Sequence, residues 1–171
     1  MSYIAAMRSE NPDARVIIIR RAPPDFSDWE QVRALILEAF AYMDARIDPP
    51  SSALRITPQS MQEDAEKGAL LLADDAGDLV GCVFVRPKGD ALYLGKLAVR
   101  PGLQGAGIGR RLVDAAGEEA RRLGLKALEL QTRIELTENH GAFGRMGFVK
   151  IGETAHEGFD RPTSITMRAN V

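Results

Sequence analysis

The sequence predicts a single α/β domain, in which about seven strands form a mostly antiparallel sheet with a central parallel pair and four helices pack on it. Two patterns carry this prediction. A strand over residues 92–99, a glycine-rich turn, a helix over 108–123 and a strand over 127–131 follow one another directly, and such a crossover makes its two strands parallel. Two apolar runs within residues 69–85 flank a turn rich in Asp and Gly, which is typical of an antiparallel hairpin.

The first part of the chain has the pattern of a strand followed by two helices. Residues 16–19 are a β-branched run that predicts the first strand. Residues 27–30 spell Ser-x-x-Glu, a capping box, and apolar positions within 32–43 then recur at helical spacing. The Pro- and Ser-rich stretch 48–52 ends this helix. Within residues 57–68, a Thr-Pro start and a closing glycine predict a second, short helix.

The second part supplies the remaining elements of the sheet. Residues 87–90 turn the chain from the hairpin into the central strand. After the long helix and its strand, Thr137 is expected to cap a fourth helix, which ends at 146–147. Strands over 148–152 and 164–168, joined by a loop, complete the predicted sheet.

Length and composition describe an ordinary globular chain of 171 residues, enough for one domain. Residues 1–13 show no periodicity and are expected to be flexible, and residues 14–171 are expected to form the domain. The formal net charge of −2 argues against nucleic acid or an anionic membrane as a partner. No apolar run approaches a membrane span, residues 1–12 lack a signal-peptide core, and Cys82 is the only cysteine, so we expect a cytoplasmic protein.

The most informative stretch is the turn between the central strand and the long helix. It consists of Gln104, Gly105, Ala106, Gly107, Ile108 and Gly109. Its glycines allow positive φ and let backbone N–H groups approach a ligand closely. A loop of bare amides that leads into a helix N-terminus is suited to an anion, above all a phosphate.

Three functional interpretations of this loop compete, besides a plain strand-to-helix turn. A Walker loop would end in Lys-Ser or Lys-Thr, which the sequence lacks, so a nucleoside triphosphatase is disfavoured. A dinucleotide-binding turn would spell Gly-x-Gly-x-x-Gly, with an acidic residue about 20 residues further on, and neither is present. The third spelling, Gln104-x-x-Gly107-x-Gly109, resembles the acyl-CoA motif of the GNAT family of N-acetyltransferases.

A second motif and the order of the elements support this resemblance. In the family an asparagine opens the fourth helix and a Gly-Phe pair begins the next strand, and here Asn139 and Gly147-Phe148 are similar to those positions. The resemblance spans roughly residues 16–168. It implies that the central strand and the strand 127–131 splay apart and that acetyl-CoA lies between them.

By this resemblance, acetyl-CoA is the co-substrate and no metal is required. The implied binding site comprises Leu97 and Val99 for the pantetheine arm, residues 104–109 for the pyrophosphate, and Arg110, Asn139 and Phe143. An arginine on the outer face of a helix can equally be only solvated, so the role of Arg110 stays open at this point.

The implied reaction is direct attack of a neutral amine on the thioester, helped by proximity and by a backbone N–H near Val99. The tyrosine that often protonates the leaving thiolate in the family lies four residues before the Gly-Phe pair, where this chain has Phe143. Water or another hydroxyl, such as that of Tyr93, would then supply the proton. The alternative is a noncatalytic acyl-CoA-binding sensor. Cys82, among apolar neighbours, is expected in the core rather than as a nucleophile.

Both histidines are expected near the cleft. His140, in the first turn of the fourth helix, is a candidate base because the helix dipole disfavours its charged form, and a solvated surface position is the alternative. His156 lies in the loop between the last strands, which borders the acceptor side in this family. Further acceptor-site candidates are Tyr42, Arg46, Asp48, Ser51 and Arg161. The acceptor is a small-molecule or peptide amine of unnamed identity, and both a monomer and a homodimer are open.

Overall fold

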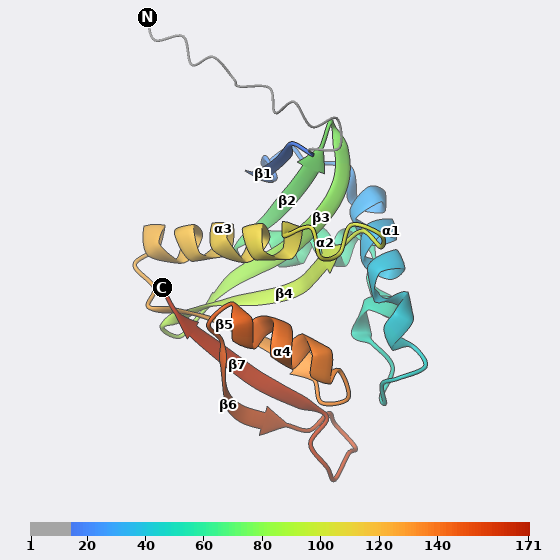
Figure 1. Cartoon of the computed structure of the whole chain (residues 1–171). Helices are drawn as coiled ribbons and strands as arrows, with labels where there is room; N and C mark the ends of the chain where they lie inside the picture. The colour runs from blue at the N-terminus through green and yellow to red at the C-terminus, as the bar shows by residue number, and fades with distance from the viewer. Residues whose placement is uncertain (1–14) are drawn as a thin grey trace, which may run out of the picture.

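The computed structural model describes residues 15–171, and Figure 1 shows the course of the chain. The segment 1–13, expected to be flexible, lies outside the described residues. The strands are β1 (Ile17–Arg21), β2 (Ala69–Asp75), β3 (Asp78–Lys88), β4 (Ala91–Val99), β5 (Ala127–Arg133), β6 (Val149–Thr154) and β7 (Ser164–Asn170). The helices are α1 (Trp29–Phe40), α2 (Pro58–Glu66), α3 (Ile108–Arg122) and α4 (Thr137–Arg145), with short 3-10 turns η1 (Ala41–Met43) and η2 (Ser52–Arg55).

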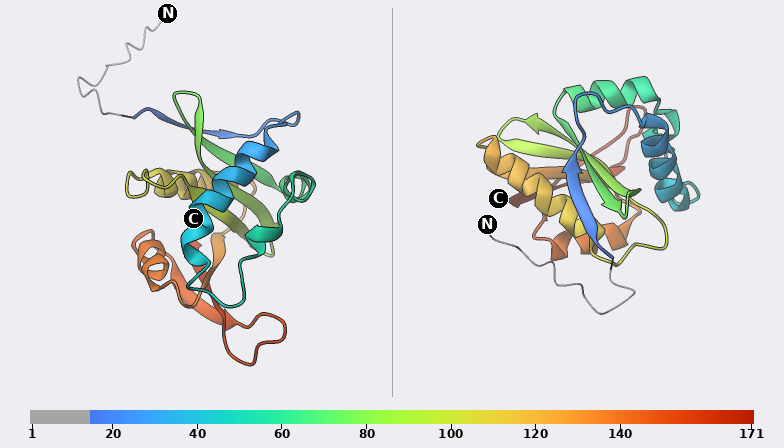
Figure 2. Two further views of the ribbon diagram at one scale, coloured as in Figure 1. Left: turned by 90° about the vertical axis from the view of Figure 1, so that its right-hand side faces the viewer. Right: turned by 90° about the horizontal axis from the view of Figure 1, so that it is seen from above.

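The strands form one sheet in the order β1-β2-β3-β4-β5-β7-β6. Within residues 15–171, β4 and β5 run parallel and every other neighbouring pair is antiparallel. The predicted fold class is therefore confirmed, with seven strands and four α-helices in the described part of the chain. Helices α1 and α2 pack on one face of the first strands and α3 packs on the other, as the views in Figure 2 show.

Two apolar clusters, one on each face, hold these layers together. Leu70 and Leu72 of β2 belong to the cluster beneath α1 and α2, whereas Leu71 and Ala73 belong to the cluster beneath α3. Because β2 is buried on both faces from Ala69 to Ala73, this part of its sequence is continuously apolar instead of alternating. Each fully buried leucine side chain contributes about 1.5–3 kcal/mol.

Two predicted helix caps are wrong. The N-cap of α1 is Asp28, and no side chain caps this helix, so the box expected between Ser27 and Glu30 does not form. With Asp28 as the N-cap, Glu30 occupies the second helical position, one short of the place from which a capping box closes. Helix α4 begins at Thr137 itself, with Leu136 as its N-cap and no capping side chain.

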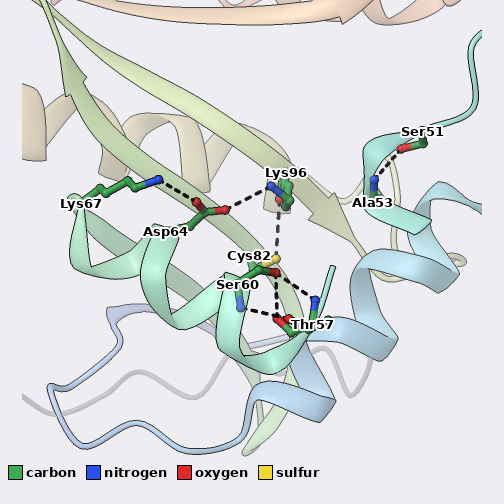
Figure 3. A network of polar contacts seen from close by, with 8 residues as sticks. All are labelled: Ser51, Ala53, Thr57, Ser60, Asp64, Lys67, Cys82 and Lys96. Atoms are coloured by element: carbon green, nitrogen blue, oxygen red, sulfur yellow. Dashed lines mark hydrogen bonds and ion pairs between the residues drawn. The ribbon is translucent and has the colours of Figure 1, made fainter. Parts of the chain in front are cut away.

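The cap predicted for α2 is confirmed. Thr57 is the N-cap, and it forms a capping box with Ser60, which the sequence analysis did not single out. The Thr57 hydroxyl accepts a hydrogen bond of 3.1 Å from the Ser60 backbone N–H, and the Ser60 hydroxyl accepts one of 2.9 Å from the Thr57 N–H. This reciprocal box, visible in Figure 3, fixes the start of α2 beside β3 and β4.

Strand β4 carries a β-bulge at its middle. Its pairing with β3 runs through Phe84–Gly95 and Cys82–Ala98, so β4 has two residues between these pairs where β3 has one. One of the two, Lys96, has a φ of 51°. A left-handed conformation is costly for a residue with a side chain, which marks this position as constrained by its surroundings.

The bulge changes which residues of β4 point to which face of the sheet. Leu92 and Leu94 pack in the cluster beneath α3, and after the bulge Leu97 and Val99 join the same cluster, whereas Ala98 packs beneath α1 and α2. Even positions face α3 before the bulge and odd positions face it afterwards. This switch explains why β4 shows no regular alternation in sequence.

Candidate active site

The parallel pairing of β4 and β5 stops halfway along the two strands. The pairs run from Ala91–Ala127 to Leu94–Leu130, yet β4 continues to Val99 and β5 continues beyond its last pair. Beyond this point the backbone N–H and C=O groups of β4 and β5 form no hydrogen bonds with one another. The strands thus open as the resemblance implied.

A cavity of about 910 Å³ lies at this opening. Of the predicted site residues, the following line it: Tyr42, Ser51, Tyr93, Leu97, Val99, Gln104, Gly105, Gly107, Ile108, Gly109, Arg110, Asn139 and Phe143. The predicted site residues that do not line it are Arg46, Asp48, Ala106, His140, His156 and Arg161. The volume falls within the range of about 300–1,000 Å³ that is usual for ligand pockets.

The glycine-rich loop has the backbone that its sequence predicted. Gly105 and Gly107 have φ values of 85° and 83°. Gly107 is the N-cap of α3 and offers no side chain to cap it. The first helical hydrogen bond, 3.0 Å long, runs from the N–H of Arg111 to the carbonyl of Gly107. The three preceding N–H groups therefore have no helical acceptor and are available to an anion.

Arginine side chains accompany these amides. Arg110 Nη2 donates a hydrogen bond of 3.2 Å to the carbonyl oxygen of Arg145, which ties the start of α3 to the end of α4. Both arginines line the cavity, so Arg110 is not simply a solvated side chain on the outer face of α3. The helix dipole and the two guanidinium groups give this end of the cavity a positive character.

Helix α4 contributes Asn139 and Phe143 to the cavity wall. The Asn139 side-chain amide lies 3.4 Å from the Tyr42 hydroxyl, and the Phe143 ring packs edge-on against Phe148 at 5.8 Å between centroids. Phe143 is therefore part of the apolar wall and offers no proton.

Tyr93 is the tyrosine that enters the cavity from the sheet. The Arg86 guanidinium and the Lys88 ammonium lie 4.9 Å and 5.1 Å from the centroid of its ring. Burial raises the pKa of the Tyr93 phenol, and the nearby cations of Lys88 and Arg86 only partly oppose this. The phenol therefore stays protonated through neutral pH and is suited to donating a proton.

Neither of the two histidines lines the cavity. His140 Nε2 lies 2.9 Å from the backbone carbonyl oxygen of Arg133, and because a carbonyl only accepts, Nε2 carries the proton. The Thr163 hydroxyl accepts a 2.9 Å bond from the backbone N–H of His156 and also contacts its Nδ1. Burial, together with the charge of Arg133, lowers the pKa of His156.

His140→Ala tests whether this histidine is a base. We expect a pH–rate profile superimposable on that of wild type, because Nε2 is committed to the Arg133 carbonyl and the side chain does not line the cavity. The loss of this hydrogen bond should lower the unfolding free energy by about 1 kcal/mol. A rate that falls by about 10² or more, with loss of the ascending limb of the profile, would instead identify His140 as the base.

The acceptor candidates of the α1–α2 linker are mostly engaged with one another or with α4. Arg46 forms a bidentate ion pair with Glu138, with an Nη2–Oε2 distance of 2.9 Å. The hydrogen bonds from Arg46 lower the pKa of the Glu138 carboxyl to about 2. Arg161 Nη2 lies 3.3 Å from Asp48 Oδ2. Of the candidates from this linker, only Tyr42 and Ser51 line the cavity.

Sequence reasoning missed Glu138 and Arg133, which both line the cavity. Arg133 donates a hydrogen bond of 3.1 Å to the carbonyl of Pro50, and its Nη1 is buried with no hydrogen-bond partner. Arg133 is the last residue of β5, which runs two residues further than the sequence predicted. The predicted strand ended at residue 131, which hid the continuation.

Neither a membrane-spanning nor a metal-holding feature is found in residues 15–171. None of the described helices combines the length and the apolar character that crossing a bilayer requires. No group of three or more His, Cys, Asp or Glu residues in this part of the chain could hold a metal ion.

Known proteins match this chain in sequence and in fold. A family model described as the acetyltransferase (GNAT) family matches residues 29–148. The chain is 32% identical over 99 residues to an IAA acetyltransferase of Azospirillum brasilense, covering 57% of this chain and 64% of that protein. It is 39% identical over 70 residues to a mycothiol acetyltransferase of Propionibacterium freudenreichii, covering 37% of this chain and 22% of that protein. The chain thus spans less than two thirds of the length of either curated relative.

Among solved structures, the PaiA N-acetyltransferase of Thermoplasma acidophilum in complex with coenzyme A has a TM-score of 0.74 to this chain. The sequences are 15% identical, and the match covers 91% of this chain and 99% of that one. At this identity the likeness shows the fold.

Proposed function

Because the chain belongs to the acetyltransferase (GNAT) family, we propose that it transfers an acetyl group from acetyl-CoA to a primary amine of a small-molecule or peptide acceptor. The observation that carries this proposal is the start of α3. There, a left-handed Gly107 leaves the first amides of the helix without helical acceptors at the edge of a large cavity. Such donors are suited to the pyrophosphate of a CoA ester.

The cleft fits acetyl-CoA in two further respects. Beyond Leu94, the edge of β4 that faces β5 has no partner strand and can pair with the amide groups of a pantetheine arm. Arg110 and Arg145 would add charge beside the phosphates. When bound, acetyl-CoA supplies the acetyl group in activated form, as a thioester.

The residues of the chain would act mainly by position and electrostatics. Holding an amine and the thioester in one cavity makes their encounter effectively unimolecular. Backbone N–H groups of β4 after the bulge would stabilise negative charge on the carbonyl oxygen. The neutral hydroxyl of Tyr93 would donate the proton that the leaving sulfur needs.

Two other side chains are unsuited to catalysis. Arg46 holds the pKa of Glu138 at about 2, so this carboxylate is a weak base near neutral pH. Burial raises the pKa of the Cys82 thiol to about 12, so it would not act as a nucleophile. The amine proton would therefore leave through water. A single, buried cysteine also suits the reducing cytoplasm, where we propose that the protein works.

The experiment that tests this proposal is an acceptor screen. Incubated with acetyl-CoA and a panel of amino acids, amino sugars, polyamines, amine antibiotics and peptides, the protein should release CoA thiol well above the blank without amine. A thiol-reactive dye measures the release, and mass spectrometry should find the acetylated amine. Thiol release without an acetylated product would indicate hydrolysis and contradict the proposal.

A noncatalytic acyl-CoA sensor is the second candidate, and Phe143 favours it because the position lacks a hydroxyl. Calorimetry separates the two candidates. Binding of acetyl-CoA at micromolar concentration without thiol release from any amine of the panel would support the sensor.

A further inference from the structure

The β4 bulge lies where the active-site cleft begins. The last β4–β5 pair is Leu94–Leu130, and the bulge follows at once, between Gly95 and Ala98. Because a bulge adds one residue, it decides which backbone N–H groups of the following segment face β3 and which face the open cleft. Without the bulge, the N–H groups that now face the cleft would face β3, and those that now face β3 would face the cleft. The geometry of the bulge therefore controls the donors that the cleft offers.

Lys96 is the residue on which the bulge depends, and its backbone is not in a relaxed state. Its φ of 51° lies in the left-handed region, where a residue with a side chain needs support from its surroundings. Glycine would adopt this conformation without strain. The sequence has lysine instead, so the surroundings of Lys96, which include the flanking strand pairs and the contacts of its side chain, must offset this strain.

Three contacts supply this support, and Figure 3 shows two of them. Lys96 Nζ lies 3.4 Å from Asp64 Oδ2 on α2 and 5.8 Å from the centroid of the Phe84 ring. The backbone carbonyl of Lys96 accepts a hydrogen bond of 3.7 Å from the Cys82 thiol. The Lys96 side chain is 24% exposed and that of Asp64 is 36% exposed, so solvent screens their ion pair only in part.

Asp64 lies on a helix with a fixed start and does not belong to the cavity wall. It belongs to α2, whose start is fixed by the reciprocal box of Thr57 and Ser60. Its other ionic partner is Lys67, at 3.7 Å, with a side chain that is 64% exposed. Asp64 does not line the cavity, so it is not placed to touch a substrate.

We propose that Asp64 is a positioning residue for acetyl transfer: by holding the Lys96 ammonium it locks the left-handed bulge, and the bulge aims the backbone donors of β4 into the cleft. This inference rests on the proposed function, because the donors matter only if a thioester carbonyl lies beside them.

A double-mutant cycle of Asp64→Asn and Lys96→Gly tests the inference. Asp64→Asn alone should lower kcat by about tenfold, less than the 10²–10³ that follows removal of a whole donor. KM for acetyl-CoA should rise by a smaller factor than kcat falls, because the loop at α3 that is proposed to bind the pyrophosphate is untouched. In the Lys96→Gly background, Asp64→Asn should change kcat by less than about twofold, since glycine holds the left-handed backbone unaided. Lys67→Gln, which removes the other partner of Asp64, is the matched control and should leave kcat unchanged.

A readout without turnover keeps this test separate from the proposed function. Amide hydrogen exchange of residues 95–98 should speed up in Asp64→Asn and return to the slow rate in the double variant. If no amine is acetylated, the proposed function fails, and exchange alone decides whether Asp64 locks the bulge. An Asp64→Asn variant with wild-type kcat and exchange overturns the inference. So does a loss that persists in the Lys96→Gly background, because the role of Asp64 would then not pass through Lys96.

Discussion

Gly109→Glu should weaken acetyl-CoA binding by about 100-fold, or about 2.7 kcal/mol, without destabilising the free protein. Gly109 is the second residue of α3 and lines the cavity. A carboxylate there would lie among the amides that are proposed to bind the pyrophosphate and would repel it. A Cβ at this position would meet Val99 Cγ2 at 3.8 Å, which is an ordinary contact. An acidic residue in the first turn also suits the helix dipole.

Calorimetry of wild type and variant with acetyl-CoA measures the effect, and thermal unfolding of the free proteins monitors the fold. Arg111→Gln is the matched control, because it changes the net charge by the same amount in the same turn of α3 but outside the cavity. It should bind acetyl-CoA nearly as wild type does. Equal affinities for Gly109→Glu and wild type would remove the phosphate assignment of the loop. Gly107 is a poorer test site, because its φ of 83° would strain any side chain placed there.

The sequence predicted the features that depend on local chemistry. The glycine-rich loop and the Thr57-Pro58 start of α2 follow from the conformations that a few neighbouring residues allow. The parallel pairing of β4 and β5 follows from the strand–helix–strand order along the chain. All three are confirmed in the structure. These elements fix the cleft and the end of it that is proposed to bind the pyrophosphate.

The remaining features depend on contacts between distant segments, which no local pattern encodes. The bulge at Lys96 is supported by Asp64, 32 residues away, and a lysine carries no signal for a left-handed backbone. The Arg46–Glu138 ion pair joins residues 92 apart. Sequence reasoning named Arg46 as an acceptor-site candidate, but in the structure its charge is compensated and the side chain does not line the cavity.

Tyr93→Phe should lower kcat by about 10²–10⁴, the scale of positioned general acid catalysis, with little change in KM for acetyl-CoA. The expectation rests on the absence of a hydroxyl from Phe143 and on the position of Tyr93 in the cavity at the point where β4 and β5 part. Burial raises the Tyr93 pKa above its ordinary value near 10. An acid acts in its protonated form, so the wild-type rate should hold across neutral pH and fall only when the pH rises through this raised pKa.

The pH–rate profile separates a proton donor from a residue that merely packs in the wall. In Tyr93→Phe the descending alkaline limb should disappear together with the rate, because no other group in the proposed mechanism titrates there. Adding Phe143→Tyr to this variant places a hydroxyl at the position where the family often has one, and part of the lost rate should return. Thermal unfolding should show little change for Tyr93→Phe, since the ring and its contacts with the Arg86 and Lys88 cations are kept. A Tyr93→Phe variant that retains both the wild-type rate and the alkaline limb would exclude this tyrosine as the acid and leave water as the proton donor to the thiolate.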